Sequence, residues 1–226
     1  MILFLHGFLG QKEDWDPLLS YLPFPTKAID LPGHGKSPMA LDIALAVKEQ
    51  VPSAPFVVGY SAGGRIALEL KARFPKDYGT LILLSAHPGL TNEQERKKRM
   101  EQDQKWIEIL SHEPFDHFLE KWYDQNLFQS FKKSGQFSAL LKRRKQQNPA
   151  HLAQFLMQYS IARKKPSEVP PDAILIHGEE DLKYERVYRK LTRVNKVYPI
   201  KNAGHAVHLE NPKACAEVID EHYRKR

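Results

Sequence analysis

The chain has 226 residues, a formal net charge of +7 and a single cysteine, Cys215. This length suits one well-buried core with a modest insertion, and one cysteine excludes an intramolecular disulfide framework. No apolar stretch reaches membrane-spanning length, and the apolar start at Met1 lacks the basic region of a signal peptide. We therefore expect a soluble, cytoplasmic protein with no membrane partner.

The positive charge is concentrated in one middle segment. Residues 87–165 hold fifteen Lys and Arg against nine Asp and Glu, which accounts for +6 of the net charge. A nucleic-acid surface, a pocket for an anionic small molecule and a solvated helical surface would each explain this excess. No nucleic-acid-binding motif accompanies it. We therefore expect a small anionic partner or a solvated surface, and no nucleic acid.

Short apolar runs of strand type alternate with helical patterns along most of the chain. The runs lie at residues 2–5, 28–30, 56–58, 81–85, 173–176 and 196–200. Helical patterns lie at residues 15–22, 43–51, 66–70 and 212–219. Continuous apolar runs are typical of strands buried on both faces of a parallel sheet with right-handed crossovers. The chain is therefore predicted to be an α/β protein with a mostly parallel, doubly wound sheet.

Residues 59–63 read Gly-Tyr-Ser-Ala-Gly between an apolar run and a helical pattern. A sharp strand-to-helix turn of this kind lifts the serine hydroxyl above the sheet edge, and it needs small residues two positions before and after the serine. Gly59 and Gly63 meet that need. Ser61 is therefore predicted to be a nucleophile at the start of a helix, where free N–H groups favour negative charge.

The loop after the first run reads His-Gly-Phe-Leu-Gly at residues 6–10. The serine turn indicates an α/β-hydrolase fold, in which this loop donates one backbone N–H to an oxyanion hole. Phe8 is the predicted donor, and Ala62 is its predicted partner. His6 could act as a base, but a structural role beneath the loop is the better interpretation.

An acidic residue and a histidine follow two later runs. Asp181 lies in the loop after residues 173–176, and His205 follows the last run. The order Ser61, Asp181, His205 is that of an α/β-hydrolase triad, in which the histidine takes the serine proton and the aspartate orients the imidazole. Asp172, Glu179 and Glu180 are alternatives to Asp181, and His208 is an alternative to His205. No metal-ligand spacing or phosphate-binding glycine loop is present, so neither a metal nor a cofactor is expected.

The pattern changes between residues 91 and 165. This segment is charged and helical, with apolar residues at helical spacing such as Phe115, Phe118, Leu119 and Trp122. We predict a helical cap at 91–165, inserted in a core formed by residues 1–90 and 166–226.

Several stretches resemble the menaquinone-pathway lyases with an α/β-hydrolase fold, the 2-succinyl-6-hydroxy-2,4-cyclohexadiene-1-carboxylate (SHCHC) synthases or MenH family. They lie at residues 5–10, 30–35, 59–65, 87–90, 122–123, 178–181 and 204–205. The specific matches are Arg65, four residues after the serine, the His-Pro-Gly-Leu stretch that leads to Arg99, and Trp122. Many members have a further strand pair before the first strand here, so the sheet is expected to have about six strands.

The resemblance implies a lyase rather than a hydrolase. Such an enzyme eliminates pyruvate from 2-succinyl-5-enolpyruvyl-6-hydroxy-3-cyclohexene-1-carboxylate, with the triad as the base. The substrate carries three carboxylates, so Arg65, Arg99 and either Arg143 or Arg144, with Arg144 preferred, would bind it. Tyr60 and Trp122 would line the pocket. The protein would act as a monomer or weak homo-oligomer.

Two alternatives remain open from the sequence. The same triad suits a carboxylester or thioester serine hydrolase, and the serine motif alone does not separate hydrolase from lyase. A non-catalytic binding protein of the same fold is the second alternative, against which the intact set of Ser61, Asp181 and His205 argues.

Overall fold

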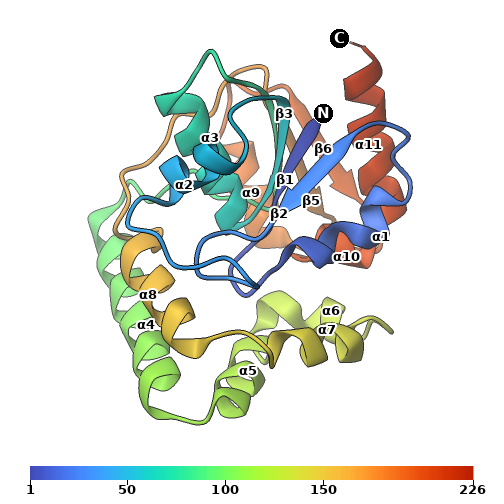
Figure 1. The fold of residues 1–226 in the computed structure, drawn as a ribbon. Coiled ribbons are helices and arrows are strands. Elements are labelled where there is room, and N and C mark those ends of the chain that lie inside the picture. Colours follow the sequence, from blue (N-terminus) through green and yellow to red (C-terminus); the bar gives the residue numbers. More distant parts are fainter. Residues whose placement is uncertain (226) are drawn as a thin grey trace.

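The apolar runs form a single sheet in which every neighbouring pair of strands is parallel. Its strands are β1 (Ile2–Leu5), β2 (Thr26–Ile29), β3 (Ala54–Tyr60), β4 (Tyr78–Leu84), β5 (Ile174–Gly178) and β6 (Lys196–Ile200). The computed structural model describes residues 1–225, and the strand order is β2-β1-β3-β4-β5-β6 (Figure 1). The predicted α/β fold with about six strands is confirmed, and the sheet is parallel throughout.

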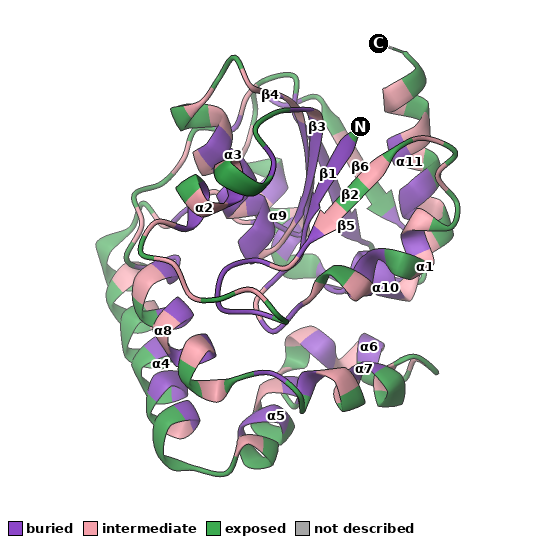
Figure 2. Ribbon diagram, in the orientation of Figure 1, coloured by how far each residue is buried: buried purple, intermediate pink, exposed green. Residues whose placement is uncertain are grey.

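Alternate side chains of the strands enter two apolar clusters, one on each face of the sheet. Leu3 and Leu5 enter the first cluster, whereas Ile2 and Phe4 enter the second. Helices that contribute to the first include α2 (Ile43–Gln50), α3 (Ala62–Arg73) and α9 (Leu182–Arg189), and those of the second include α1 (Asp16–Leu19) and α11 (Pro212–Arg224). Figure 2 shows the central strands buried between these layers, as a parallel sheet with helical crossovers requires.

Several boundaries differ from the sequence pattern, two of them at the start of β4 and after β1. Strand β4 begins at Tyr78, before the apolar run at 81–85, because its first residues also pair with β3. The helix predicted over 15–22 is instead a 3₁₀ turn, η1 (Lys12–Trp15), followed by the short α1. Pro23 disfavours helical backbone at the residue before it, which explains why the helix does not continue.

Helices fill the chain between β4 and β5. They are α4 (Glu93–His112), α5 (Phe115–Tyr123), η2 (Asn126–Phe128), α6 (Gln129–Lys132), α7 (Phe137–Arg144) and α8 (Pro149–Tyr159). They lie below the edge at which the strands end (Figure 1). Trp106, Phe118 and Leu152 of these helices share an apolar cluster with Leu9 and Leu209 of the rest of the chain. The helical segment is thereby packed against the carboxyl edge of the sheet.

The chain ends on two helices. A short helix that the apolar pattern does not show, α10 (Val207–Glu210), precedes α11. Asn211 caps α11, since its side-chain oxygen accepts a hydrogen bond from the Ala214 N–H at 3.2 Å. Of the helices within residues 1–225, none combines the length and the apolar character that crossing a membrane demands.

Candidate active site

Ser61 occupies a strained turn between β3 and α3. Its backbone has φ 49° and ψ −107°, a conformation that non-glycine residues rarely adopt. A Cβ atom on Gly59 would lie 2.6 Å from the Gly64 Cα, and one on Gly63 would lie 2.2 Å from the Leu5 carbonyl oxygen. The two glycines therefore permit the close approach that the turn needs, as the sequence motif predicts.

Two backbone N–H groups beside Ser61 have no acceptor within residues 1–225. They belong to Phe8, in the loop after β1, and to Ala62, the first residue of α3. The first N–H groups of a helix have no partner within it, which accounts for Ala62. Both residues line the same cavity as Ser61. They are thus available to an oxygen atom bound next to the serine.

Both ring nitrogens of His6 form hydrogen bonds beneath this loop. Its Nδ1 donates to the Gly7 carbonyl oxygen at 2.8 Å, and its Nε2 accepts from the Leu31 N–H at 2.9 Å. Burial lowers the pKa of His6, so the imidazole is neutral. This geometry supports the structural role proposed for His6, which ties the loop after β1 to the loop after β2.

Asp181 and His205 meet at the carboxyl edge of the sheet. Asp181 Oδ2 lies 2.9 Å from His205 Nδ1, and both side chains are buried. Asp181 also caps α9, because its Oδ1 accepts from the Tyr184 N–H at 3.2 Å. This pairing occupies Nδ1 and leaves Nε2 as the imidazole nitrogen available for proton transfer. His205 and Ser61 line one cavity.

The alternative candidates for the acid and the base of the triad do not form such a pair. Asp172, Glu179 and Glu180 are exposed. His208 is buried between the rings of Trp15 and Tyr60, and no carboxylate within residues 1–225 bonds its imidazole. Burial lowers the pKa of His208 to about 3, which leaves it neutral. These positions favour Asp181 and His205 for proton transfer.

A cavity of about 580 Å³ lies between the sheet edge and the helical segment. This volume is in the range of small-molecule sites. Its lining includes most of the predicted site residues, namely Phe8, Tyr60, Ser61, Ala62, Arg65, Arg99, Trp122, Arg144 and His205. Arg143 is outside this lining. The predicted residues therefore converge from both parts of the chain on one space.

Arg65 projects from α3 into the cavity without a carboxylate partner among residues 1–225. Its buried Nε has no hydrogen bond, and one terminal nitrogen donates to the Tyr159 carbonyl oxygen at 3.5 Å. Burial lowers the pKa of Arg65, and the positive charge of Arg99 lowers it further. Arg99 itself bonds Asp103 at 2.8 Å. An unpaired, desolvated guanidinium is costly unless an anion binds it.

Arg144 is engaged within the protein. Its guanidinium bonds the carboxylate of Asp14 through two nitrogens, and its Nε donates to the Tyr123 hydroxyl at 3.1 Å. Arg143 donates to the same carboxylate at 3.0 Å. Burial alone would raise the pKa of Asp14, but the charge of Arg144 outweighs it and holds the pKa at about 2. Arg144 lines the cavity, yet its charge is neutralised by Asp14 rather than free for a ligand.

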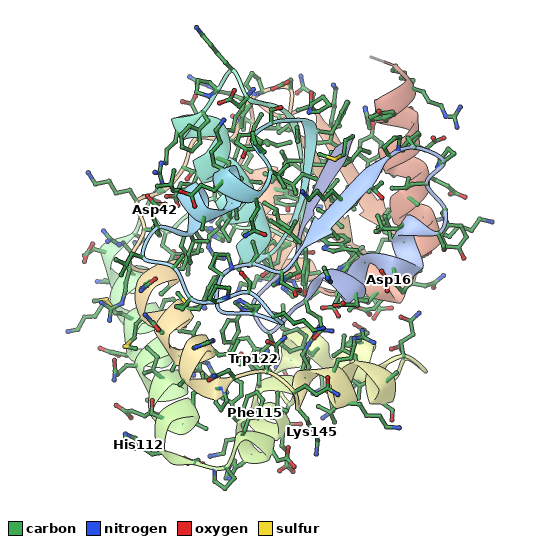
Figure 3. The ribbon with its side chains drawn as sticks, viewed as in Figure 1. Asp16, Asp42, His112, Phe115, Trp122 and Lys145 are labelled. Carbon is green, nitrogen blue, oxygen red and sulfur yellow. The ribbon has the colours of Figure 1, made fainter. Side chains whose placement is uncertain are left out.

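Aromatic rings form the remainder of the expected lining. Trp122 lies on the side of α5 that faces the sheet (Figure 3), with its ring centroid 4.9 Å from that of Phe8. Tyr60 packs its ring against His205 at 5.3 Å. The two residues thus bound the space around the serine from opposite parts of the chain.

The cavity lining includes further residues that were not predicted as site residues from the sequence, among them a lysine, a tyrosine and a histidine. Lys183 and Tyr184 follow Asp181 on α9, and His87 follows β4. Burial lowers the pKa of Lys183, and Arg99 lowers it further. Lys183 and Tyr184 carry no motif, so only the folded geometry identifies them. His87 belongs to the matched stretch at 87–90 but was given no role from the sequence. Within residues 1–225, no group of three or more His, Cys, Asp or Glu side chains could hold a metal ion.

The pKa of His87 offers a test of the positive potential in the cavity. Burial, followed by Lys183, Arg65 and Arg99, lowers this pKa to about 4. We expect Lys183→Met to raise it by roughly half a unit, because a nearby like charge is removed. The His87 ring resonances, followed by NMR between pH 3 and 8, measure this shift. Lys121→Met, on exposed α5 surface, should leave it unchanged, and an equal shift in both variants would contradict a local effect.

Known proteins resemble the whole chain. The model of the alpha/beta hydrolase family matches residues 2–218. A 2-succinyl-6-hydroxy-2,4-cyclohexadiene-1-carboxylate synthase of Enterobacter sp. (strain 638) is 34% identical over 243 residues, which cover 100% of this chain and 92% of the relative. Among solved structures, MenH from S. aureus has a TM-score of 0.90 at 24% identity and covers 99% of this chain and 93% of its own. A malate-bound thermophilic esterase from Thermogutta terrifontis has a TM-score of 0.75 at 18% identity, with 99% and 89% covered.

Proposed function

The chain belongs to the alpha/beta hydrolase family and, within it, to the MenH family, and from this premise we propose that it is an SHCHC synthase of menaquinone biosynthesis. The reaction would be the elimination of pyruvate from 2-succinyl-5-enolpyruvyl-6-hydroxy-3-cyclohexene-1-carboxylate. In this proposal the enzyme is a carbon–oxygen lyase without a cofactor. It acts in the cytoplasm as a monomer or weak homo-oligomer.

The observation that carries the proposal is the unpaired positive charge beside the serine. Arg65 has no carboxylate partner within residues 1–225, and Arg99 and Lys183 line the same cavity. A substrate with three carboxylates would supply the missing negative charge. Guanidinium groups bind carboxylates through two parallel hydrogen bonds, which orients the substrate as well as attracting it.

The triad would act as a base in this reaction. His205 accepts the proton of Ser61, and Asp181 stabilises the resulting imidazolium. The serine oxygen then removes the proton next to the succinyl ketone, and the electron pair forms an enolate whose oxygen is held by the N–H groups of Phe8 and Ala62. Collapse of the enolate breaks the carbon–oxygen bond to the enolpyruvyl group. The leaving group takes up a proton and departs as pyruvate.

The helical segment would serve as a cap. We propose that residues 91–165 close over the substrate, while residues 1–90 and 166–226 form the core that holds the triad. The shared apolar cluster and the ion pairs of Arg143 and Arg144 with Asp14 support this division, because they join the two parts next to the cavity. A closed cap would exclude water and so favour elimination over hydrolysis.

Pyruvate release tests the proposal. The unstable substrate is generated in situ by the preceding pathway enzymes, and lactate dehydrogenase reports pyruvate. We expect Ser61→Ala to lower kcat/KM by at least about 10³-fold and Arg99→Ala by roughly 10- to 100-fold. Arg96→Ala is the matched control on α4, since Arg96 bonds Glu93 and the Ala162 carbonyl oxygen outside the cavity lining. It should retain activity within about twofold.

The serine hydrolase is the alternative outcome of the same assay. Pyruvate release no faster than the spontaneous rate, together with Ser61-dependent turnover of simple esters, would exclude the lyase. A protein that binds the substrate without any turnover would indicate a non-catalytic member of the fold.

A further inference from the structure

One residue outside the triad contacts two of its members and shares a cavity with the third. The Tyr184 N–H donates to Asp181 Oδ1 at 3.2 Å. The Tyr184 ring lies against the His205 imidazole, with centroids 4.9 Å apart and planes inclined by 37°. Its hydroxyl lies close enough to Ser61 for the serine to lower the pKa of the phenol. Tyr184 also lines the cavity, so its hydroxyl lies where the chemistry is proposed.

The phenol of Tyr184 stays protonated at physiological pH. Its side chain is 6% exposed. Burial raises the pKa of Tyr184 to about 12, although Arg65 and Ser61 act in the opposite direction. A neutral phenol can donate one hydrogen bond, and it is a stronger acid than an aliphatic hydroxyl. Between two hydroxyls, the phenol is therefore the preferred donor and the serine oxygen the preferred acceptor.

We propose that Tyr184 is a positioning residue that donates a hydrogen bond to the Ser61 oxygen and so leaves the serine proton free for His205. This inference rests on the proposed role of Ser61, His205 and Asp181. As the serine proton moves to His205, negative charge grows on the serine oxygen, and the phenol hydrogen bond becomes charge-assisted and stronger. An interaction that strengthens in the transition state accelerates the step.

The next turn of α9 offers a matched control. Tyr188 is 2% exposed, and its hydroxyl donates to the Leu83 carbonyl oxygen at 3.2 Å and accepts from the Ala86 N–H at 2.8 Å. It is absent from the cavity lining. Tyr188→Phe therefore removes a buried hydroxyl with a structural role, whereas Tyr184→Phe removes the hydroxyl close to Ser61.

The experiment measures the reactivity of Ser61 with an alkyl fluorophosphonate. The serine oxygen attacks phosphorus, fluoride leaves, and the serine proton passes to His205. We expect Tyr184→Phe to lower the second-order rate constant by roughly 10- to 100-fold, with little change in Tm. Tyr188→Phe should instead lower Tm by several degrees and react within about twofold of the wild type. Ser61→Ala, checked by mass spectrometry, gives the blank.

Pyruvate kinetics provide a second measurement. Tyr184→Phe should lower kcat by a similar factor and leave KM within about twofold, because the hydroxyl acts on the serine rather than on the substrate. A Tyr184→Phe protein that reacts as fast as the wild type, or faster, would overturn the inference. A loss of Tm equal to that of Tyr188→Phe would also overturn it, since the effect would then be structural.

The two assays distinguish a failure of the proposed lyase function from a failure of the positioning role of Tyr184. If the wild type releases no pyruvate but reacts with the fluorophosphonate, and Tyr184→Phe reacts slowly, the lyase proposal fails and the positioning role stands. If the wild type releases pyruvate and Tyr184→Phe matches it in both assays, only the positioning role fails. A wild type inert in both assays would overturn both.

Discussion

Arg65→Met is expected to lower kcat/KM for pyruvate release by about 10²- to 10³-fold and to stabilise the protein. Two charge-assisted hydrogen bonds to a substrate carboxylate are lost, each worth roughly 1.5–3 kcal/mol. The folded protein, in contrast, loses a charge whose Nε is buried without a hydrogen-bond partner among the described residues. Methionine has a similar length and no charge to desolvate, so the free energy of unfolding should rise by about 1 kcal/mol. Steady-state kinetics and urea unfolding measure the two effects.

Arg73→Met on the same helix is the control. Arg73 lies on the surface of α3, where it pairs with Asp42 at 2.7 Å and Glu69 at 3.2 Å. Figure 3 places Asp42 on the outside of the molecule, away from Trp122. Loss of this exposed pairing should cost no more than about 1 kcal/mol and leave activity within about twofold. If Arg65→Met destabilised the protein as Arg73→Met does, Arg65 would be a structural residue rather than an anion ligand.

Local patterns predicted the sheet and the serine turn because short-range sterics decide both. Continuous apolar runs belong in a parallel sheet buried on both faces, and the structure places Leu5 and Phe4 in opposite apolar clusters. Gly59 and Gly63 could be assigned because a side chain at either position would collide with neighbouring backbone. The meeting of Asp181 and His205 follows from topology, since parallel strands end at one edge.

Contacts across the helical segment could not be read from the sequence. Arg144 was predicted as a substrate ligand, but its guanidinium is bonded to Asp14, 130 residues earlier in the chain. The sequence patterns of α7 and η1 do not predict where the two contact each other, because this contact depends on how two separately formed apolar clusters pack together. Tyr184 was missed for the same reason. Its ring comes next to His205 only when α9 packs at the sheet edge, and no motif marks a lone tyrosine.

Asp14→Asn is expected to destabilise the protein by about 3 kcal/mol, the cost of leaving a buried cation without its partner. Asp14 is 2% exposed and bonds both Arg143 and Arg144, the second of which is 3% exposed. Asparagine keeps the shape and one acceptor oxygen but removes the charge. For a chain of 226 residues this loss corresponds to a fall in Tm of roughly 10 °C, measurable by calorimetry.

The pH dependence of this loss identifies its electrostatic origin. The pKa of Asp14 is held at about 2, below the ordinary 3.8, so its ionised form stabilises the folded state above about pH 4. That contribution is lost as the pH falls towards 2, because the folded carboxylate is then protonated as well. The difference in stability between wild type and Asp14→Asn should therefore shrink between pH 4 and 2. A difference that is constant over this range would point to shape rather than charge.

Two further variants test whether the loss of stability in Asp14→Asn comes from its ion pair with Arg144. Asp16→Asn makes the same change two residues away on an exposed side chain, at the periphery in Figure 3, and should cost less than about 1 kcal/mol. Arg144→Met combined with Asp14→Asn removes the buried cation together with its partner, so the double variant should recover much of the stability that Asp14→Asn loses. Full additivity of the two single losses would show that the ion pair does not couple α7 to η1. Recovery would show that the contact between the helical segment and the sheet edge depends on charge neutralisation beside the cavity, in which Arg65 has no carboxylate partner among the described residues.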